Sequence, residues 1–210
     1  NPEFEFFLYD DQMCRNFIQR HFGPNVVYAF DSLIPGAYKA DLWRYCVLYI
    51  YGGIYMDIKL QTVNGFKLID LIHEECFPVD IIYLNKYYGI WQGFLICKPG
   101  NPILKQCIEQ IIINVKRCYY GETILSVTGP GLMYDIINKY NLNYYNESKV
   151  KLMKIDNSYQ SNEVGLYYKN RLIIYFYKKY NNERFKNGEI HYSKLWENKN
   201  IYNIIFNPII

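Results

Sequence analysis

The chain has 210 residues and is 50% hydrophobic, which is enough to bury one substantial core and favours a single domain over residues 1–210. Its formal net charge is only +3, and its Lys and Arg residues are scattered among Asp and Glu without a basic run. This balance argues against a nucleic-acid partner, including one bound by aromatic stacking, because such binding also needs a basic surface.

Strands and helices alternate along the chain. We expect strands at residues 4–9, 26–30, 54–59, 79–84 and 94–97, and helices at residues 12–22, 38–51, 101–116 and 129–140. Asp11 is expected to cap the first of these helices, and the last two open with Asn-Pro and Gly-Pro. Two more strand candidates, at residues 150–155 and 171–177, favour an antiparallel edge. This order predicts an α/β protein with a largely parallel, three-layer sheet.

The stretch from residue 37 to residue 60, AYKADLWRYCVLYIYGGIYMDIKL, joins a nearly all-apolar helix to a short strand. Gly52 and Gly53 supply the left-handed turn that ends such a helix. In the strand that follows, Asp57 and Lys59 are two residues apart and therefore point to the same side. Ligands of open α/β sheets collect at the carboxyl ends of strands. The sequence thus predicts one hollow lined by five polar side chains, namely Asp41, Arg44, Tyr55, Asp57 and Lys59.

Asp41 and Arg44 are three residues apart and share one face of the predicted helix. If exposed, they would form an ordinary ion pair worth roughly 0.2–0.5 kcal/mol. The helix is apolar nearly all round, however, which indicates burial, and buried charges need partners or a purpose. We therefore favour a binding role for this pair.

The same stretch resembles the sugar-binding DXD region of the family 32 glycosyltransferases, whose pattern is A-D-x-x-R-Y-x-x-L-x-x-x-G-G-x-Y-x-D-x-D. The chain matches that pattern from Ala40 to Asp57 and departs from it at Lys59, where the family has its second Asp. The family includes fungal Golgi mannosyltransferases, ceramide-linked sugar transferases and many proteins of large DNA viruses, and clostridial glucosylating toxins look like more distant relatives. Weaker matches follow in the family's order, including T-G-P-G from residue 128 and a His and a Trp near the end.

The resemblance implies a GT-A-like, Rossmann-type fold and a retaining transferase. The reaction would move a hexose from a UDP- or GDP-sugar to a hydroxyl acceptor on a glycan, a lipid or a protein. Asp41, Arg44, Gly53 and Tyr55 would bind the donor sugar. Asp57 would touch the ribose and the sugar and help to hold a divalent ion, Mn²⁺ or Mg²⁺, which stabilises the leaving diphosphate.

Thr128, Gly129 and Pro130 resemble the family's T-G-P-G segment. A Pro in the first helical turn, with Gly before it, leaves backbone N–H groups facing a cleft, although the same arrangement is also an ordinary helix start. Together with Gln92, these residues are the predicted acceptor side of the cleft.

His191, Ser193 and Trp196 resemble C-terminal elements of the family. The resemblance implies that His191 and Trp196 close over the diphosphate as a lid and that Ser193 completes the metal shell. A His beside a Tyr is also common as a purely structural residue.

Lys59 leaves two outcomes open, because an ammonium group cannot ligate a metal. Either Lys59 contacts the diphosphate itself and supplies part of the positive charge, which makes it a catalytic candidate beside Asp57 and makes the metal uncertain. Or the site is degraded, and the protein is a non-catalytic binder of a nucleotide-sugar or glycan. Donor turnover separates the two.

The sequence shows no apolar run long enough to cross a bilayer and no opening signal peptide. The chain begins without Met, at a point where the family already has its first strand behind it. We therefore expect a soluble domain, in the cytoplasm of an infected host cell if the protein is viral, or in the Golgi or ER lumen if an upstream anchor is missing.

Overall fold

The computed structural model describes residues 1–63, 65–73, 75–80, 89–139, 150–154, 164–176 and 190–203. The helices of this part are α1 (Asp11–His21), α2 (Pro24–Ser32), α3 (Gly36–Tyr51), α4 (Pro102–Lys116), α5 (Pro130–Lys139) and α8 (Tyr192–Glu197), with a 3-10 helix at Leu68–Leu71. The strands are β1 (Gly53–Met56), β2 (Leu60–Thr62), β3 (Val79–Asp80), β4 (Gly89–Ile90), β5 (Phe94–Cys97), β6 (Val150–Lys154), β7 (Val164–Tyr168) and β8 (Arg171–Phe176). The expected mixture of helices and strands is confirmed.

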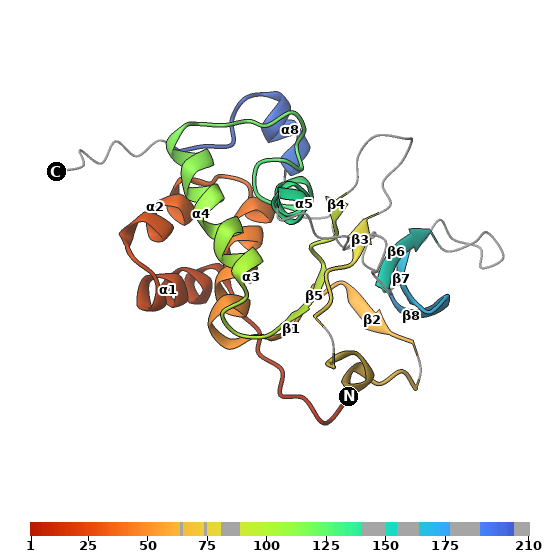
Figure 1. Ribbon diagram of the computed structural model, residues 1–210. Helices are drawn as coiled ribbons and strands as arrows, with labels where there is room; N and C mark the ends of the chain where they lie inside the picture. Colours follow the sequence, from red (N-terminus) through yellow and green to blue (C-terminus); the bar gives the residue numbers. More distant parts are fainter. Residues whose placement is uncertain are drawn as a thin grey trace.

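The strands form two sheets. One is the pair β1–β5, and the other has the order β2-β8-β7-β6-β3-β4. In Figure 1, α1 to α4 gather on one side of the molecule, the larger sheet lies on the other, and β1 and β5 run between them. The ribbon of β1 and β5 therefore separates the helical half from the sheet half.

The prediction of a largely parallel sheet is wrong for the described residues. Only β3 and β6 pair in parallel there, and the other five strand pairs are antiparallel. One reason is the tight link between β7 and β8, where Lys169 and Asn170 both have positive φ, as two-residue hairpin turns require. The antiparallel pairing expected near the C-terminus is confirmed, in β6, β7 and β8.

Two predicted strands are not strands in the structure. Residues 26–30 lie within α2, because Pro24 takes the first helical turn and the apolar residues then recur with helical spacing. Val26, Ala29 and Phe30 are accordingly buried on one face. Residues 4–9 belong to no helix or strand, and Phe6, Phe7 and Leu8 there are exposed. A strand needs a neighbour to hydrogen-bond, and no strand pairing includes this segment within the described residues.

The other elements match their predictions more closely. The strand expected at residues 54–59 ends at Met56, and residues 81–84, 155 and 177 of other predicted strands lie outside the described residues. The N-cap of α1 is Asp10, whose side chain accepts a hydrogen bond from the Met13 N–H, and not Asp11. Asn101 caps α4 in the same way, as the Asn-Pro signal indicated.

The helix α3 ends where the double glycine predicted it would. Gly52 has a φ of 64°, and a Cβ atom there would lie 2.7 Å from the Pro99 nitrogen. Both the backbone angle and the close approach therefore need a glycine. The chain passes through this turn directly from α3 into β1. The site residues predicted on the helix, Asp41 and Arg44, therefore lie next to the one on the strand, Tyr55.

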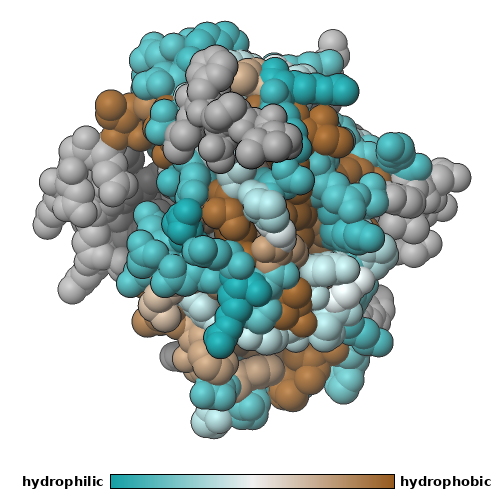
Figure 2. Space-filling view, turned by 90° about the vertical axis from the view of Figure 1, so that its left-hand side faces the viewer, coloured by the Kyte–Doolittle hydropathy of each residue, from teal (hydrophilic) through white to brown (hydrophobic). Residues whose placement is uncertain are grey.

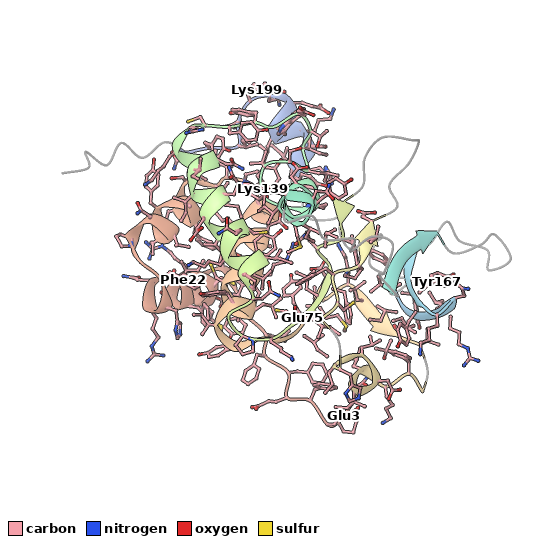
Figure 3. The ribbon with its side chains drawn as sticks, in the orientation of Figure 1. Glu3, Phe22, Glu75, Lys139, Tyr167 and Lys199 are labelled. Atoms are coloured by element: carbon pink, nitrogen blue, oxygen red, sulfur yellow. The ribbon has the colours of Figure 1, made fainter. Side chains whose placement is uncertain are left out.

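Two hydrophobic clusters form the core. The larger joins the helices α1 to α5, and the smaller lies between the 3-10 helix and the strands β2, β7 and β8. Successive residues of β5 alternate between them, since Leu95 and Cys97 belong to the larger cluster and Phe94 and Ile96 to the smaller. Figure 3 shows side chains on both sides of this ribbon, from the helical half, where Phe22 is labelled, to the sheet half, where Tyr167 is labelled.

The outer face of the helical half is mixed in polarity. In Figure 2, hydrophilic residues cover much of the visible surface and hydrophobic ones lie in separate patches. No helix among the described residues has both the length and the apolar character needed to cross a membrane.

Candidate functional site

The buried pair of Asp41 and Arg44 is the centre of the candidate site. Both residues lie on α3, one turn apart, and are more than 90% buried. Nη1 of Arg44 donates a hydrogen bond to Oδ1 of Asp41. The predicted burial of the pair is therefore confirmed, and so is its position on one helix face.

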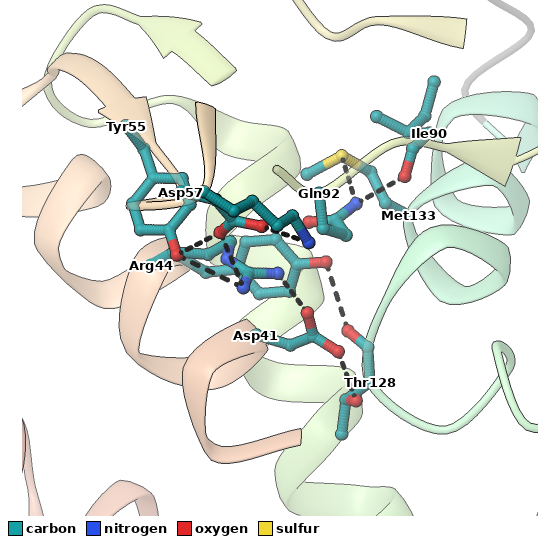
Figure 4. Close-up of polar contacts among 10 residues, drawn as sticks. Asp41, Arg44, Tyr55, Asp57, Ile90, Gln92, Thr128 and Met133 are labelled. Carbon is teal, nitrogen blue, oxygen red and sulfur yellow. Dashed lines mark hydrogen bonds and ion pairs between the residues drawn. The ribbon is translucent and has the colours of Figure 1, made fainter. Parts of the chain in front are cut away.

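The second oxygen of Asp41 binds the segment that precedes α5. The Thr128 hydroxyl donates to Asp41 Oδ2 at 2.7 Å, and the Tyr45 hydroxyl donates to the Thr128 carbonyl at 3.1 Å. Asp41 and Tyr45, which lie one turn apart on α3 and far from Thr128 along the chain, thus hold Thr128 in place. Figure 4 shows Thr128 facing Asp41 from the side of α5.

Arg44 connects this buried pair to β1. Its Nη2 donates to the Tyr55 hydroxyl at 3.3 Å and lies 3.8 Å from Oδ1 of Asp57. The guanidinium also lies over the Tyr55 ring, 4.8 Å from the centroid, in a cation–π contact. The Arg44 Nε is buried and has no hydrogen-bond partner within the described residues.

Asp57 follows β1 directly. Its backbone N–H donates to the Gly93 carbonyl at 2.8 Å, which continues the pairing of β1 with β5 by one residue. The Tyr55 hydroxyl donates to Asp57 Oδ1 at 2.8 Å, so these two side chains point to the same side. The strand relation predicted for Asp57 and Lys59 does not apply, because β1 ends at Met56. Gly53 begins the strand that carries Tyr55.

Lys59 lies on the other side of the Asp57 carboxylate. Its Nζ is 2.9 Å from Asp57 Oδ2 and 5.3 Å from the centroid of the Phe176 ring on β8. The chain turns after Asp57, with the Leu60 N–H donating to the Asp57 carbonyl at 2.9 Å. Asp41, Arg44, Tyr55, Asp57 and Lys59 thus form one chain of contacts. Figure 4 shows the part from Asp41 to Asp57. That these side chains line a hollow stays a prediction.

The electrostatics of the two carboxylates differ. Burial raises the pKa of Asp41, and the charge of Arg44 and the hydrogen bond from Thr128 offset part of that effect. Burial also acts to raise the pKa of Asp57, but the charges of Arg44 and Lys59 outweigh it, so the pKa of Asp57 is lowered. Asp57 is therefore an anion at neutral pH. Burial raises the pKa of Tyr55, which keeps the proton that it donates to Asp57.

The described residues do not fit a divalent metal ion. Mg²⁺ and Mn²⁺ favour about six oxygen ligands in octahedral geometry. No group of three or more His, Cys, Asp or Glu side chains within the described residues could hold such an ion. The ammonium of Lys59 already lies where a cation would bind Asp57. The hydroxyl of Ser193, the other predicted metal ligand, lies 2.8 Å from Nδ1 of His191.

The remaining predicted residues occupy two places. Gln92 is buried between β4 and β5, and its Nε2 donates to the Ile90 carbonyl at 2.8 Å, while its Oε1 has no partner within the described residues. At the other place, His191 caps α8, and the Trp196 indole donates to the Tyr120 carbonyl at 2.6 Å. These contacts fix α8 against the segment after α4, and the predicted lid over a diphosphate stays a prediction.

Two contributors to the site had no assigned role in the sequence. Tyr45 stands in the matched pattern next to Arg44, and its hydrogen bond to Thr128 gives a reason for a Tyr there. Phe176 carried no local signal, because its contact with Lys59 joins strands far apart in the chain.

Gly129 offers a direct test of how tightly this site is built. A Cβ atom at Gly129 would lie 2.6 Å from Asp41 Oδ2, which is too close, so Asp41 or the segment before α5 would have to move. We expect Gly129→Ala to lower the free energy of unfolding by roughly 1–3 kcal/mol, as overpacking does. Urea unfolding measures this. In Gly36→Ala, the matched control, the new Cβ meets nothing within 4 Å, so stability should be unchanged or slightly higher. Equal effects at both positions would contradict the described contact.

Comparison with known proteins relates the chain to glycosyltransferases. Residues 1–78 match the family described as "Glycosyltransferase sugar-binding region containing DXD motif". The chain is 38% identical over 131 residues to inositol phosphoceramide mannosyltransferase 3 of Schizosaccharomyces pombe, covering 62% of this chain and 35% of the relative. It is 28% identical over 169 residues to the initiation-specific alpha-1,6-mannosyltransferase of the same yeast, covering 67% and 42%. An uncharacterized glycosyltransferase of Acanthamoeba polyphaga mimivirus is 27% identical over 136 residues, covering 65% and 52%.

These matches confirm the resemblance to the DXD-type glycosyltransferases. Residues 1–78, which include α3, β1 and Lys59, are the part that matches the description of the family's sugar-binding region. The chain spans about half or less of the length of the relatives named above.

Proposed function

We propose that this chain is the donor-binding domain of a retaining glycosyltransferase of GT-A type, which moves a hexose from a UDP- or GDP-sugar to a hydroxyl acceptor. The observation that carries the proposal is the continuous network from Asp41 through Arg44 and Tyr55 to Asp57. It lies in the segment that matches the family's sugar-binding region.

The network suits a sugar because it presents charged, fixed polar groups at the end of a strand. Asp41 accepts and Arg44 donates hydrogen bonds, and both are held by neighbours, so a sugar hydroxyl would meet groups already oriented. Tyr55 adds an aromatic ring beside them. The ionised Asp57 lies next, where it would contact the ribose or the sugar.

The acceptor side is proposed at Thr128, Gly129 and Pro130 together with Gln92. Thr128 and Gly129 touch Asp41 directly, so a molecule bound beyond them would lie next to the donor sugar. The buried Gln92 supports the same assignment through its unsatisfied Oε1 within the described residues, since a buried acceptor of this kind is suited to a ligand hydroxyl. Mannose is the first hexose to test, because two of the relatives are named mannosyltransferases.

A second candidate is a nucleotide-sugar binder that performs no transfer. It is favoured by one observation, namely that both oxygens of Asp57 are engaged by the chain's own Tyr55 and Lys59. Such a protein would bind a nucleoside diphosphate sugar and release it unchanged.

A donor-hydrolysis screen distinguishes the two candidates. The chain would be incubated with mannose- and glucose-carrying GDP- and UDP-sugars, with manganese, with magnesium and with EDTA, and the released nucleoside diphosphate measured. We expect slow hydrolysis of one donor by the folded protein and no hydrolysis by the heat-denatured protein. Binding of a donor by calorimetry without any release would favour the binder, and neither binding nor release of any donor would overturn the proposed function.

A further inference from the structure

The Asp57 carboxylate is enclosed by groups that the chain itself supplies. Tyr55 donates to Oδ1 at 2.8 Å, Arg44 lies 3.8 Å from the same oxygen, and Lys59 lies 2.9 Å from Oδ2. Each oxygen thus has a strong donor or cation beside it. A divalent ion bound at Oδ2 of Asp57 would lie beside the ammonium of Lys59, which carries a charge of the same sign.

Lys59 is held in a defined position. The carboxylate of Asp57 fixes its ammonium on one side, and the Phe176 ring lies 5.3 Å from it on β8. Only 23% of the Lys59 side chain is exposed. A charge that is partly shielded from water interacts more strongly with an anion than a fully solvated surface lysine does.

Arg44 does not duplicate this role. Its Nη1 is committed to the buried Asp41, and its guanidinium is fixed over the Tyr55 ring. Lys59 is therefore the cation at Oδ2 of Asp57, whereas Arg44 lies nearest to Oδ1.

We propose that the Lys59 ammonium binds the diphosphate of the donor in place of a divalent ion, and that Asp57 positions Lys59 for this task. A lysine ammonium is a compact point charge and a common phosphate ligand. In the reaction it would stabilise the negative charge that develops on the leaving diphosphate as its bond to the sugar breaks. The inference rests on the proposed function, and it predicts nucleoside diphosphate binding that needs no metal.

Isothermal titration calorimetry with UDP and with GDP tests the inference on the whole chain, once in EDTA and once in manganese. We expect wild type to bind one of the two nucleotides with the same affinity, within about threefold, in both buffers. Lys59→Met should weaken that binding in EDTA by about 10- to 100-fold, which is the range for losing a hydrogen bond to a charged group.

Two further variants sharpen the experiment. Lys59→Asp creates the family's D-x-D pair, so it should bind poorly in EDTA and recover in manganese. Lys105→Met is the matched control, because it removes an exposed lysine that is also paired with a carboxylate, Glu109, on α4. It should bind like wild type.

The outcomes separate this inference from the proposed function. Wild-type binding that appears only with manganese, or unchanged binding in a folded Lys59→Met variant, overturns the role of Lys59 and leaves the proposed function standing. If neither nucleotide binds in either buffer, and no intact nucleotide-sugar binds either, both fail together.

Discussion

Replacing Arg44 with methionine should destabilise the protein by about 3–5 kcal/mol, the range for removing one partner of a buried ion pair. Arg44 and Asp41 are 5% and 7% exposed, and Arg44→Met would leave the Asp41 carboxyl buried with only Thr128 as a polar partner among the contacts described above. Urea unfolding at neutral pH measures the loss. Without Arg44, burial would raise the pKa of Asp41 in the folded variant above its value in the unfolded chain. The free energy of unfolding of Arg44→Met should therefore fall further as the pH rises through that raised pKa.

The double variant Asp41→Asn/Arg44→Met is the control for this prediction. It leaves no unpaired charge, so part of the lost stability should return, and the two changes should be strongly non-additive. If Arg44→Met lowers the free energy of unfolding by less than about 1 kcal/mol, and the double variant recovers none of it, then Asp41 and Arg44 do not form a buried ion pair.

The pair should also affect ligands selectively. Under conditions where Arg44→Lys and Asp41→Asn remain folded, we expect both to impair hexose transfer more than binding of the free nucleoside diphosphate, because we assign the pair to the sugar. Calorimetry and donor turnover measure the two effects. Equal losses for both would mean that the pair only holds α3 in place.

Asp57→Asn should reduce donor turnover by about 10²- to 10³-fold, as the loss of one positioned electrostatic group in an active site does. The amide keeps the shape of the side chain and can still accept the hydrogen bond from Tyr55, but it no longer holds the ammonium of Lys59 by charge. The backbone hydrogen bond to Gly93 is unchanged by the substitution. Thermal unfolding should therefore stay cooperative, with a stability change of about 1 kcal/mol or less.

Glu109→Gln is the matched control for Asp57→Asn. It also removes a carboxylate that is paired with a lysine, but on the exposed face of α4. Turnover should be unaffected there, since exposed pairs of this kind contribute little. Wild-type turnover in Asp57→Asn would remove Asp57 from the site, and loss of the cooperative transition would mean that its role is structural.

Much of the candidate site could be predicted because its members are close in sequence. Helical periodicity places Asp41 and Arg44 on one face of a helix, and the structure bears this out. Strand periodicity predicted that Asp57 and Lys59 point to one side of a strand, but β1 ends at Met56 and the chain turns after Asp57, so their contact is made across a turn. The start of α4 at Asn101 was similarly readable, because capping is a contact between near neighbours.

The strands were harder to predict than the helices. An apolar run of five residues can form either a helix or a strand. At residues 26–30 it is part of a helix, because Pro24 takes the first helical turn. Strand direction depends on which segments pair, and no local pattern reports that choice, so the largely parallel sheet was a wrong prediction.

By itself, the sequence determined which charged residues belong to the site and how Asp41 and Arg44 are oriented on one helix, because helix geometry makes this relation local. Only the tertiary structure decided their partners. In the folded chain the Thr128 hydroxyl donates to Asp41, and the Asp57 N–H donates to the Gly93 carbonyl. The Phe176 ring lies beside the Lys59 ammonium. These contacts join segments that are distant in sequence, so no local pattern of the sequence could report them.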